Sequence, residues 1–115
     1  MLKKNNRISR DKDFDRVFKT GRSFYSPILG IKAAENGLSV NRLGILINVK
    51  VSKKAVERNL YRRRLREIIK QEFSGMKKGH DLAVIVFPPI LEKDFKEIKV
   101  IVKQGLMKLG LYKKI

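Results

Sequence analysis

Basic side chains at helical spacing are the residues of this sequence best suited to chemistry with a ligand. Arg58, Arg62, Arg66 and Lys70 follow one another four positions apart, which on a helix aligns them in one ridge. Like charges at this spacing destabilise an isolated helix by about 0.2–0.5 kcal/mol per pair. Arginine also holds phosphate groups through paired hydrogen bonds. The spacing therefore predicts a helix face that binds an anionic partner.

Neighbouring polar residues widen this basic surface. Asn59 and Arg63 fall beside the ridge on a helical wheel, and Lys54 precedes it. An asparagine amide offers both a donor and an acceptor to a base edge or a 2′-hydroxyl. The plainer interpretation is a solvated basic face, or ion pairs with acids of the last predicted helix. We favour phosphate binding, because 11 Asp and Glu residues cannot neutralise 28 Lys and Arg residues.

The sequence offers little for catalysis by the protein itself. His80 is the single histidine and stands next to Asp81, a pair more typical of a turn than of acid–base chemistry. Asp11, Asp13 and Asp15 fall at the start of a predicted helix, where acids favour the helix dipole. Cysteine is absent, and a two-metal nuclease needs carboxylates gathered from several elements. We expect no catalytic residue and no metal site in the protein.

The composition indicates one folded, strongly basic domain. The chain has 115 residues, a formal net charge of +17 and 43% hydrophobic residues, enough for a single core. Such a balance favours a polyanionic partner or an anionic membrane surface. No secretory signal pattern and no apolar run of membrane-spanning length occurs. We expect a cytoplasmic protein with one domain over 1–115, bound to neither a membrane nor a small-molecule substrate.

Hydrophobic periodicity predicts the elements that position these residues. A first helix begins with Ser9 as N-cap, ends at Gly21 and places Phe14 and Phe18 on one face. The other predicted elements are strands at 27–33 and 42–49, joined as a hairpin, a helix at 52–73 capped by Ser52, a strand at 82–87 and a helix at 91–109. A short strand near 49–52 stays open. This order predicts an α+β fold with helices packed on one small sheet.

Two apolar stripes mark the core-facing sides of the longer helices. In the basic helix the stripe is Tyr61, Leu65, Ile68 and Ile69. In the last helix the stripe is Leu91, Phe95, Ile98, Val102, Leu106 and Leu109, close to a 3.6-residue period.

The basic helix and several other segments, in order along the chain, resemble the bacterial ribonuclease P protein component. Arg58-Asn59, Arg62-Arg63 and Arg66 follow the spacing of the signature helix of that family, although Leu60 replaces its second arginine. The other matching segments are 2–8, 13–21, 42–45, 81–86 and 111–114. The resemblance covers nearly the whole chain.

This resemblance implies an α/β sandwich, similar to domains of ribosomal proteins, with about three helices on a four-stranded sheet. It also implies a left-handed strand–helix–strand crossover, against the usual rule. The implied function is the RNA-binding subunit of a ribonucleoprotein endonuclease that removes the 5′ leader from precursor tRNA. Catalysis and Mg²⁺ belong to the RNA subunit in this family.

The resemblance assigns two sets of binding residues, each to its own RNA. The residues expected to bind the catalytic RNA are Lys54, Arg58, Asn59, Arg62, Arg63 and Arg66. The residues expected in a cleft for the leader are Phe14, Phe18, Lys32 and Tyr112. An exposed aromatic pair stacks on bases of any sequence, which suits a variable leader.

Other interpretations of the same sequence remain open at this point. A ribosomal or general RNA-binding protein fits the size and charge equally well. A DNA-binding protein with the basic helix in a major groove would need a partner helix just before it, and a predicted strand stands there instead. Phe14 and Phe18 are also compatible with plain core packing. The ordered motifs favour the ribonuclease P subunit.

Overall fold

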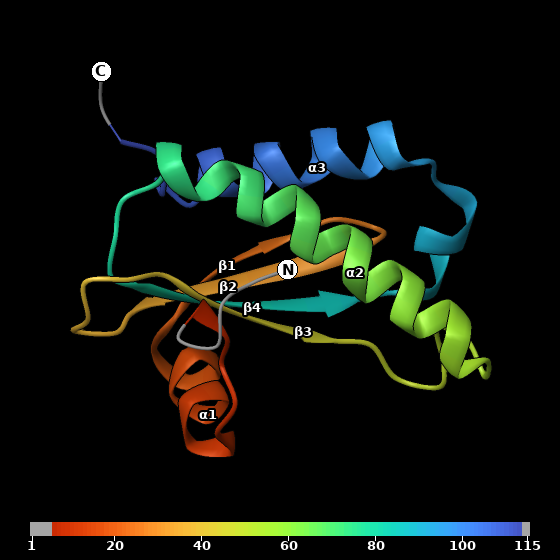
Figure 1. Cartoon of the computed structure of the whole chain (residues 1–115), viewed down its shortest axis with the longest axis horizontal. Coiled ribbons are helices and arrows are strands. Elements are labelled where there is room, and N and C mark those ends of the chain that lie inside the picture. The colour runs from red at the N-terminus through yellow and green to blue at the C-terminus, as the bar shows by residue number, and fades with distance from the viewer. Residues whose placement is uncertain (1–5, 114–115) are drawn as a thin grey trace.

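A four-stranded mixed sheet carries the helices of this protein (Figure 1). The computed structural model describes residues 6–113. The elements run in the order α1 (Asp11–Thr20), β1 (Arg22–Tyr25), β2 (Leu29–Glu35), β3 (Arg42–Leu46), α2 (Ala55–Glu72), β4 (His80–Val86) and α3 (Phe95–Lys108), with short 3₁₀ helices at Phe73–Gly75 and Pro88–Glu92. The predicted α+β class is confirmed.

The strand order in the sheet is β1-β2-β4-β3. β1 pairs with β2 and β2 with β4 in antiparallel fashion, whereas β3 and β4 are parallel. The expected hairpin of the strands at 27–33 and 42–49 is therefore wrong. These strands correspond to β2 and β3, and β4 lies between them. The reason is burial: β4 is buried at all but one position, and a strand so apolar is most stable with a neighbour on each side.

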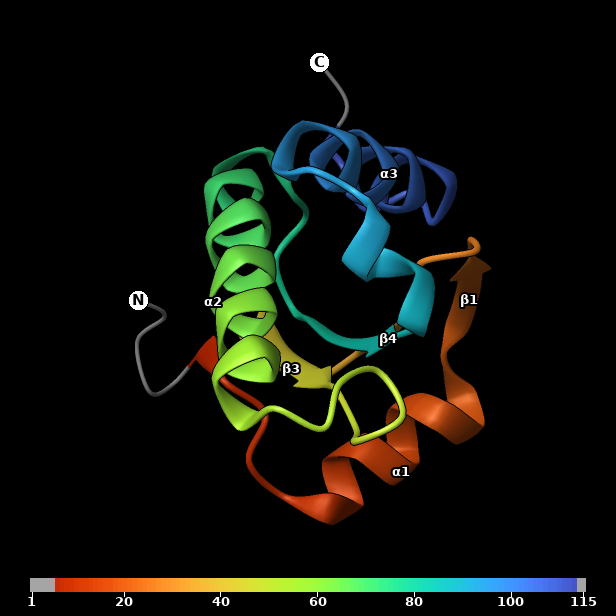
Figure 2. The same ribbon diagram turned by 90° about the vertical axis from the view of Figure 1, so that its right-hand side faces the viewer.

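The two faces of the sheet carry different helices. α2 and α3 cover one face, and α1 lies against the other (Figures 1 and 2). The main core fills the space under α2 and α3. A smaller cluster of Val17, Ala34 and Ala83, with Phe14 and Phe18 packed on it, holds α1 to the opposite face.

The ends of the elements differ from the sequence expectations in three places. α2 begins at Ala55 with Lys54 as N-cap, and Ser52 instead accepts a hydrogen bond from the Lys54 backbone N–H at 3.2 Å. Likewise, α1 has Arg10 rather than Ser9 as N-cap. α3 begins only at Phe95, because Asp94 caps it by accepting a hydrogen bond from the Glu97 N–H at 2.9 Å.

Periodicity missed one short strand and left one segment open. Strand β1 is missing from the sequence prediction, since only Phe24 among its four residues is turned inward. The segment near 49–52 forms a turn and no strand.

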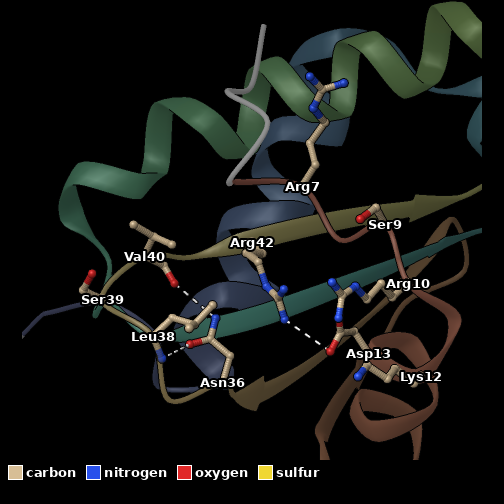
Figure 3. Close-up of a pocket in the computed structure, with 10 residues that line it drawn as sticks. All are labelled: Arg7, Ser9, Arg10, Lys12, Asp13, Asn36, Leu38, Ser39, Val40 and Arg42. Carbon is tan, nitrogen blue, oxygen red and sulfur yellow. Dashed lines mark hydrogen bonds and ion pairs between the residues drawn. The ribbon is translucent and has the colours of Figure 1, made fainter.

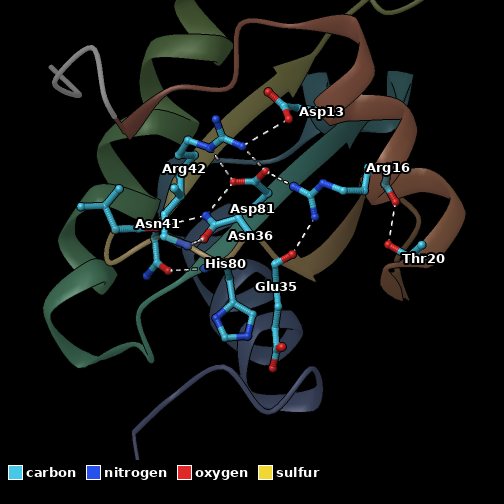
Figure 4. A network of polar contacts seen from close by, with 11 residues as sticks. Asp13, Arg16, Thr20, Glu35, Asn36, Asn41, Arg42, His80 and Asp81 are labelled. Carbon is cyan, nitrogen blue, oxygen red and sulfur yellow. Dashed lines mark hydrogen bonds and ion pairs between the residues drawn. The ribbon is translucent and has the colours of Figure 1, made fainter.

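A buried carboxylate ties α1 to the sheet (Figure 4). The Asp81 side chain is fully buried and accepts hydrogen bonds from Arg42 Nε at 2.8 Å, Asn36 Nδ2 at 2.9 Å and the Arg16 guanidinium. Arg42 also lies 3.5 Å from Asp13. These contacts join α1, β3, β4 and the loop after β2, so they fix where α1 crosses the sheet.

Candidate nucleic-acid interface

The α2 ridge, composed of Arg58, Arg62, Arg66 and Lys70, runs along the helix beside its core-facing stripe. The core-facing stripe is confirmed, since Tyr61, Leu65, Ile68 and Ile69 are all buried. Arg58, Arg62 and Arg66 are half-buried, and Lys70 is exposed. The ridge therefore borders the core stripe and still presents its charges outward.

Local hydrogen bonds orient the first part of this ridge. Arg58 donates from Nη1 to the Ser52 carbonyl oxygen at 2.8 Å, which ties it to the turn before the helix. Arg62 donates from Nη1 to Asn59 Oδ1 at 2.8 Å. Each arginine keeps other N–H groups for a ligand. The amide oxygen of Asn59 is already engaged, so its NH₂ group is the part left for a partner.

Lys54, Arg63 and Arg66 complete the expected set on and beside the helix. Lys54 and Arg63 are exposed. Burial lowers the pKa of Arg66, and the positive charges of Arg62 and Arg7 lower it further. The three arginines therefore form a concentrated positive field around Arg66. An anion placed there would relieve the repulsion.

A hollow of about 350 Å³ opens between α1 and the sheet, at the carboxyl ends of β3 and β4. Its lining residues are Phe18, Ile45, Leu46, Ile47, Asn48, Arg62, Ile85 and Val86. Arg62 and Asn48 supply the polar side chains among these residues. Arg62, expected in the catalytic-RNA set, thus also lines the hollow that contains Phe18.

Phe14 and Phe18 lie on the same side of the sheet but in different surroundings. A Cβ at Gly44 would collide with the Phe14 ring, so Phe14 packs directly on the β3 backbone. Phe18 is half-buried and lines the hollow. The Lys32 Nζ lies 5.7 Å from the centre of the Phe18 ring, within the range of a cation–π interaction. The structure thus brings Phe18 and Lys32 together and uses Phe14 mainly to seat α1.

Tyr25 is an aromatic residue on this face that the sequence analysis missed. It is 57% exposed. The sheet register places Tyr25 opposite Gly30, Gly30 opposite Ile85 and Ile85 opposite Leu46. A Cβ at Gly30 would lie 2.7 Å from the Tyr25 ring, so the ring spreads over the glycine. We call Tyr25, Ile85 and Leu46 the sheet platform. Tyr25 was missed because the sequence did not predict strand β1.

Tyr112, expected in the leader cleft, does not line the hollow that contains Phe18. Its hydroxyl donates to Glu72 Oε1 at 2.7 Å, and its backbone pairs with Met76 beyond the end of α2. Burial raises the pKa of the Tyr112 hydroxyl, and the hydrogen bond to Glu72 raises it further. The C-terminal segment docks here because Gly110, at φ +69°, turns the chain after α3.

Asp81 and His80 occupy structural positions. Asp81 is saturated by its arginine and asparagine partners. The backbone N–H of His80 donates to Asn41 Oδ1 at 2.9 Å, and the ring is buried. Within residues 6–113, no three His, Cys, Asp or Glu side chains come close enough to hold a metal ion. No helix of this part is long and apolar enough to cross a membrane.

Comparison with known sequences decides the family. A family model described as Ribonuclease P matches residues 2–110. The chain belongs to the bacterial ribonuclease P protein family. The ribonuclease P protein component of Clostridium botulinum is 31% identical over 114 residues, covering 95% of this chain and 98% of the relative. That of Clostridium acetobutylicum is 33% identical over 110 residues, covering 94% and 92%.

Solved structures of ribonuclease P proteins share the whole fold. The Staphylococcus aureus RNase P protein superposes with a TM-score of 0.85 at 27% identity, covering 94% of this chain and 98% of that protein. The Thermotoga maritima RNase P protein gives a TM-score of 0.73 at 29% identity, covering 90% and 93%. The chain is therefore a component of the ribonuclease P endoribonuclease, an RNA-binding protein of tRNA processing, and its partners are the ribonuclease P RNA and precursor tRNA.

Proposed function

We propose that this protein divides two RNA partners between two surfaces. The α2 ridge, with Lys54, Asn59 and Arg63, binds the catalytic RNA. The hollow and the sheet platform on the α1 side bind the 5′ leader of precursor tRNA. The observation that carries the proposal is the chemical difference between the surfaces: one is a row of cations, and the other combines aromatic rings with a few cations.

The composition of the α2 ridge suits a folded RNA with closely spaced phosphates. Guanidinium groups bind phosphate oxygens in pairs, and the Asn59 NH₂ group can donate to a base edge or a 2′-hydroxyl. A bound phosphate would relieve the charge repulsion that Arg62 and Arg7 exert on Arg66. The buried stripe of α2 packs into the core and fixes the helix. The ridge is therefore held in place before the RNA binds.

The hollow and the sheet platform suit a strand whose sequence varies from one precursor to the next. Phe18 and Tyr25 offer ring faces, which stack on any base at about 1–3 kcal/mol per base. Neighbouring strands lie about 4.8 Å apart, so the row from Tyr25 across to Leu46 spans about 14 Å. That length accommodates more than one stacked base. Lys32 and Arg62 stand at the same face to contact the phosphates of the strand.

We assign the cleavage chemistry to the RNA subunit with its Mg²⁺, and the location to the cytoplasm. The metal-ligating side chains of residues 6–113 do not gather into a set that fits Mg²⁺. A reconstitution tests the assignment: ribonuclease P RNA and precursor tRNA are mixed at low magnesium with and without this protein. We expect 5′ cleavage to be stimulated by the protein, and RNA-free protein to cleave nothing. Cleavage by protein freed of all RNA, or no stimulation, would contradict the assignment.

A further inference from the structure

A second and larger hollow lies at the opposite end of α1 from Phe18. It is a groove of about 980 Å³ between the segment leading into α1 and the loop that follows β2 (Figure 3). One wall carries Arg7, Ser9, Arg10 and Lys12, and the other carries Asn36, Leu38, Ser39 and Val40. Asp13 and Arg42 lie between the walls.

The charge in the groove is strongly unbalanced. Four cations, Arg7, Arg10, Lys12 and Arg42, face a single carboxylate, Asp13. That carboxylate is 3.5 Å from Arg42 and so is already paired. Arg7, Arg10 and Lys12 are exposed, and no ion pair joins them to an acid within residues 6–113. The wall of the groove thus holds three unneutralised positive charges.

The floor of the groove is rigid before any ligand binds. Arg42 is held by two hydrogen bonds to the buried Asp81, which raise its pKa above the ordinary arginine value (Figure 4). Asn36, at the foot of the opposite wall, donates to Asp81 and to the Val40 carbonyl oxygen at 3.1 Å. The floor and the foot of the Asn36 wall are therefore fixed to the same buried carboxylate, so Arg42 and Asn36 lose little conformational entropy when the groove is filled.

The groove is continuous with the α2 ridge and remote from the Phe18 hollow. The backbone of Arg7 forms a parallel bridge with Leu43 of β3, and its side chain points toward α2 (Figure 3). The positive charge of Arg7 there contributes to the lowered pKa of Arg66. Arg42 begins β3, whereas Leu46, at the hollow, ends it. Four residues of strand place these ends about 13 Å apart.

We propose that this groove binds the sugar–phosphate backbone of a strand of the catalytic RNA, extending the α2 contact past Arg66 to Lys12. The proposal rests on the function assigned to α2 above. The Arg7 side chain points toward α2 and that of Arg10 toward Asp13 (Figure 3), so the cations serve successive phosphates rather than one small anion. Leu38, 48% exposed on the opposite wall, offers apolar surface to the sugars or bases.

The first test measures the salt dependence of binding to the catalytic RNA. A variant carrying Arg7→Ala, Arg10→Ala and Lys12→Ala is compared with a control carrying Lys96→Ala, Lys99→Ala and Lys108→Ala on α3, which loses the same charge. We expect the log–log slope of affinity against salt to shrink by about 0.7–0.9 per lost phosphate contact in the groove variant. The control should keep the parental slope, and both should keep cooperative thermal unfolding.

The second test identifies the strand in the groove. Because the chain contains no cysteine, Ser39→Cys gives a single attachment point for an iron chelate that cleaves nearby RNA. In the assembled complex with precursor tRNA, we expect cuts in the catalytic RNA and none in the leader. Cuts in the leader, or a groove variant whose slope equals that of the control, would overturn the proposal. If an Arg58→Ala, Arg66→Ala variant also binds the catalytic RNA with the parental slope, the proposed function fails instead.

Discussion

Arg62 of α2 and Phe18 of α1 line the same hollow, although they come from helices on opposite faces of the sheet. The ridge and the leader surface therefore meet at Arg62. An arginine at this junction can contact a leader phosphate while its neighbours Arg58 and Arg66 contact the catalytic RNA. The two proposed surfaces are therefore not confined to separate helices, as the sequence suggested, because they share Arg62.

Replacing Arg62 by alanine should weaken precursor tRNA binding by the assembled complex. A charge-assisted contact with a phosphate is worth about 1.5–3 kcal/mol, which corresponds to roughly a tenfold loss or more. Mature tRNA has no leader, so its affinity should change little. The matched control is Arg22→Ala, an exposed arginine of β1 outside both proposed surfaces. Equal losses for precursor and mature tRNA in Arg62→Ala would assign this residue to the catalytic RNA alone.

Tyr25→Ala should lower precursor affinity without unfolding the protein. The ring is 57% exposed, so its removal costs little core packing, whereas a lost stacking contact costs about 1–3 kcal/mol. Tyr25→Phe keeps the ring and should bind as the parent does. The measurement is the ratio of precursor to mature tRNA affinity, together with thermal unfolding of the free variants. A parental ratio in Tyr25→Ala would remove this residue from the leader surface.

Tyr112→Phe should leave the precursor-to-mature ratio unchanged, because Tyr112 contacts Glu72 and not the cleft. Its effect should appear in stability at high pH. The folded protein raises the pKa of this hydroxyl, so above pH ~10 the unfolded chain releases a proton that the folded chain retains. Stability therefore falls as pH rises through that range, and it should fall less steeply in Tyr112→Phe. Denaturant unfolding at pH 8 to 11 measures both slopes; identical slopes would contradict the buried, hydrogen-bonded hydroxyl.

Asp81→Asn should destabilise the fold by about 3–5 kcal/mol, because it leaves the charges of Arg16 and Arg42 without their buried partner. Asp15→Asn is the control, since Asp15 is an exposed acid of helix α1 outside the Asp81 network. Urea unfolding of the two variants measures the difference. If both midpoints stay near the parental value, the Asp81 network does not hold α1 on the sheet.

Local pattern accounts for the parts of the fold that the sequence predicted correctly. The stripe from Tyr61 to Ile69 and the stripe from Ile98 to Leu109 are buried, because helical periodicity alone determines which residues share a face. Leu91 and Phe95 were placed in the second stripe, yet they are 38% and 39% exposed. Leu91 belongs to the 3₁₀ helix Pro88–Glu92, which buries Ile90 instead, and Phe95 is the first residue of α3. The helical period therefore does not extend back to Leu91.

Contacts between distant segments explain what the sequence could not predict. The choice of β4 as neighbour of both β2 and β3 depends on all strands competing for the centre of the sheet. The presence of Arg62 beside Phe18 depends on how α1 and α2 are placed relative to one sheet edge. The position of Tyr112 depends on the turn at Gly110 and on the hydrogen bond from its hydroxyl to Glu72. None of these relations leaves a periodic signal in the chain.

The division of two RNAs between two surfaces is tested most directly by a pair of variants in the reconstituted complex. Arg58→Ala with Arg66→Ala changes only the α2 ridge, and Phe18→Ala changes only the α1 side; Arg62 is left intact because it lines both. For each variant, affinity for the catalytic RNA at several salt concentrations and affinities for precursor and mature tRNA are measured, with thermal unfolding as the check on folding.

We expect each variant to lose affinity for a different RNA. The arginine variant should lose affinity for the catalytic RNA, with a salt slope smaller by about 0.7–0.9 per lost contact, and keep the precursor-to-mature ratio. Phe18→Ala should keep the catalytic-RNA affinity and lose about 1–3 kcal/mol of precursor binding. Parallel losses of all three affinities in Phe18→Ala, with a much lower melting temperature, would return Phe18 to the core and contradict the division.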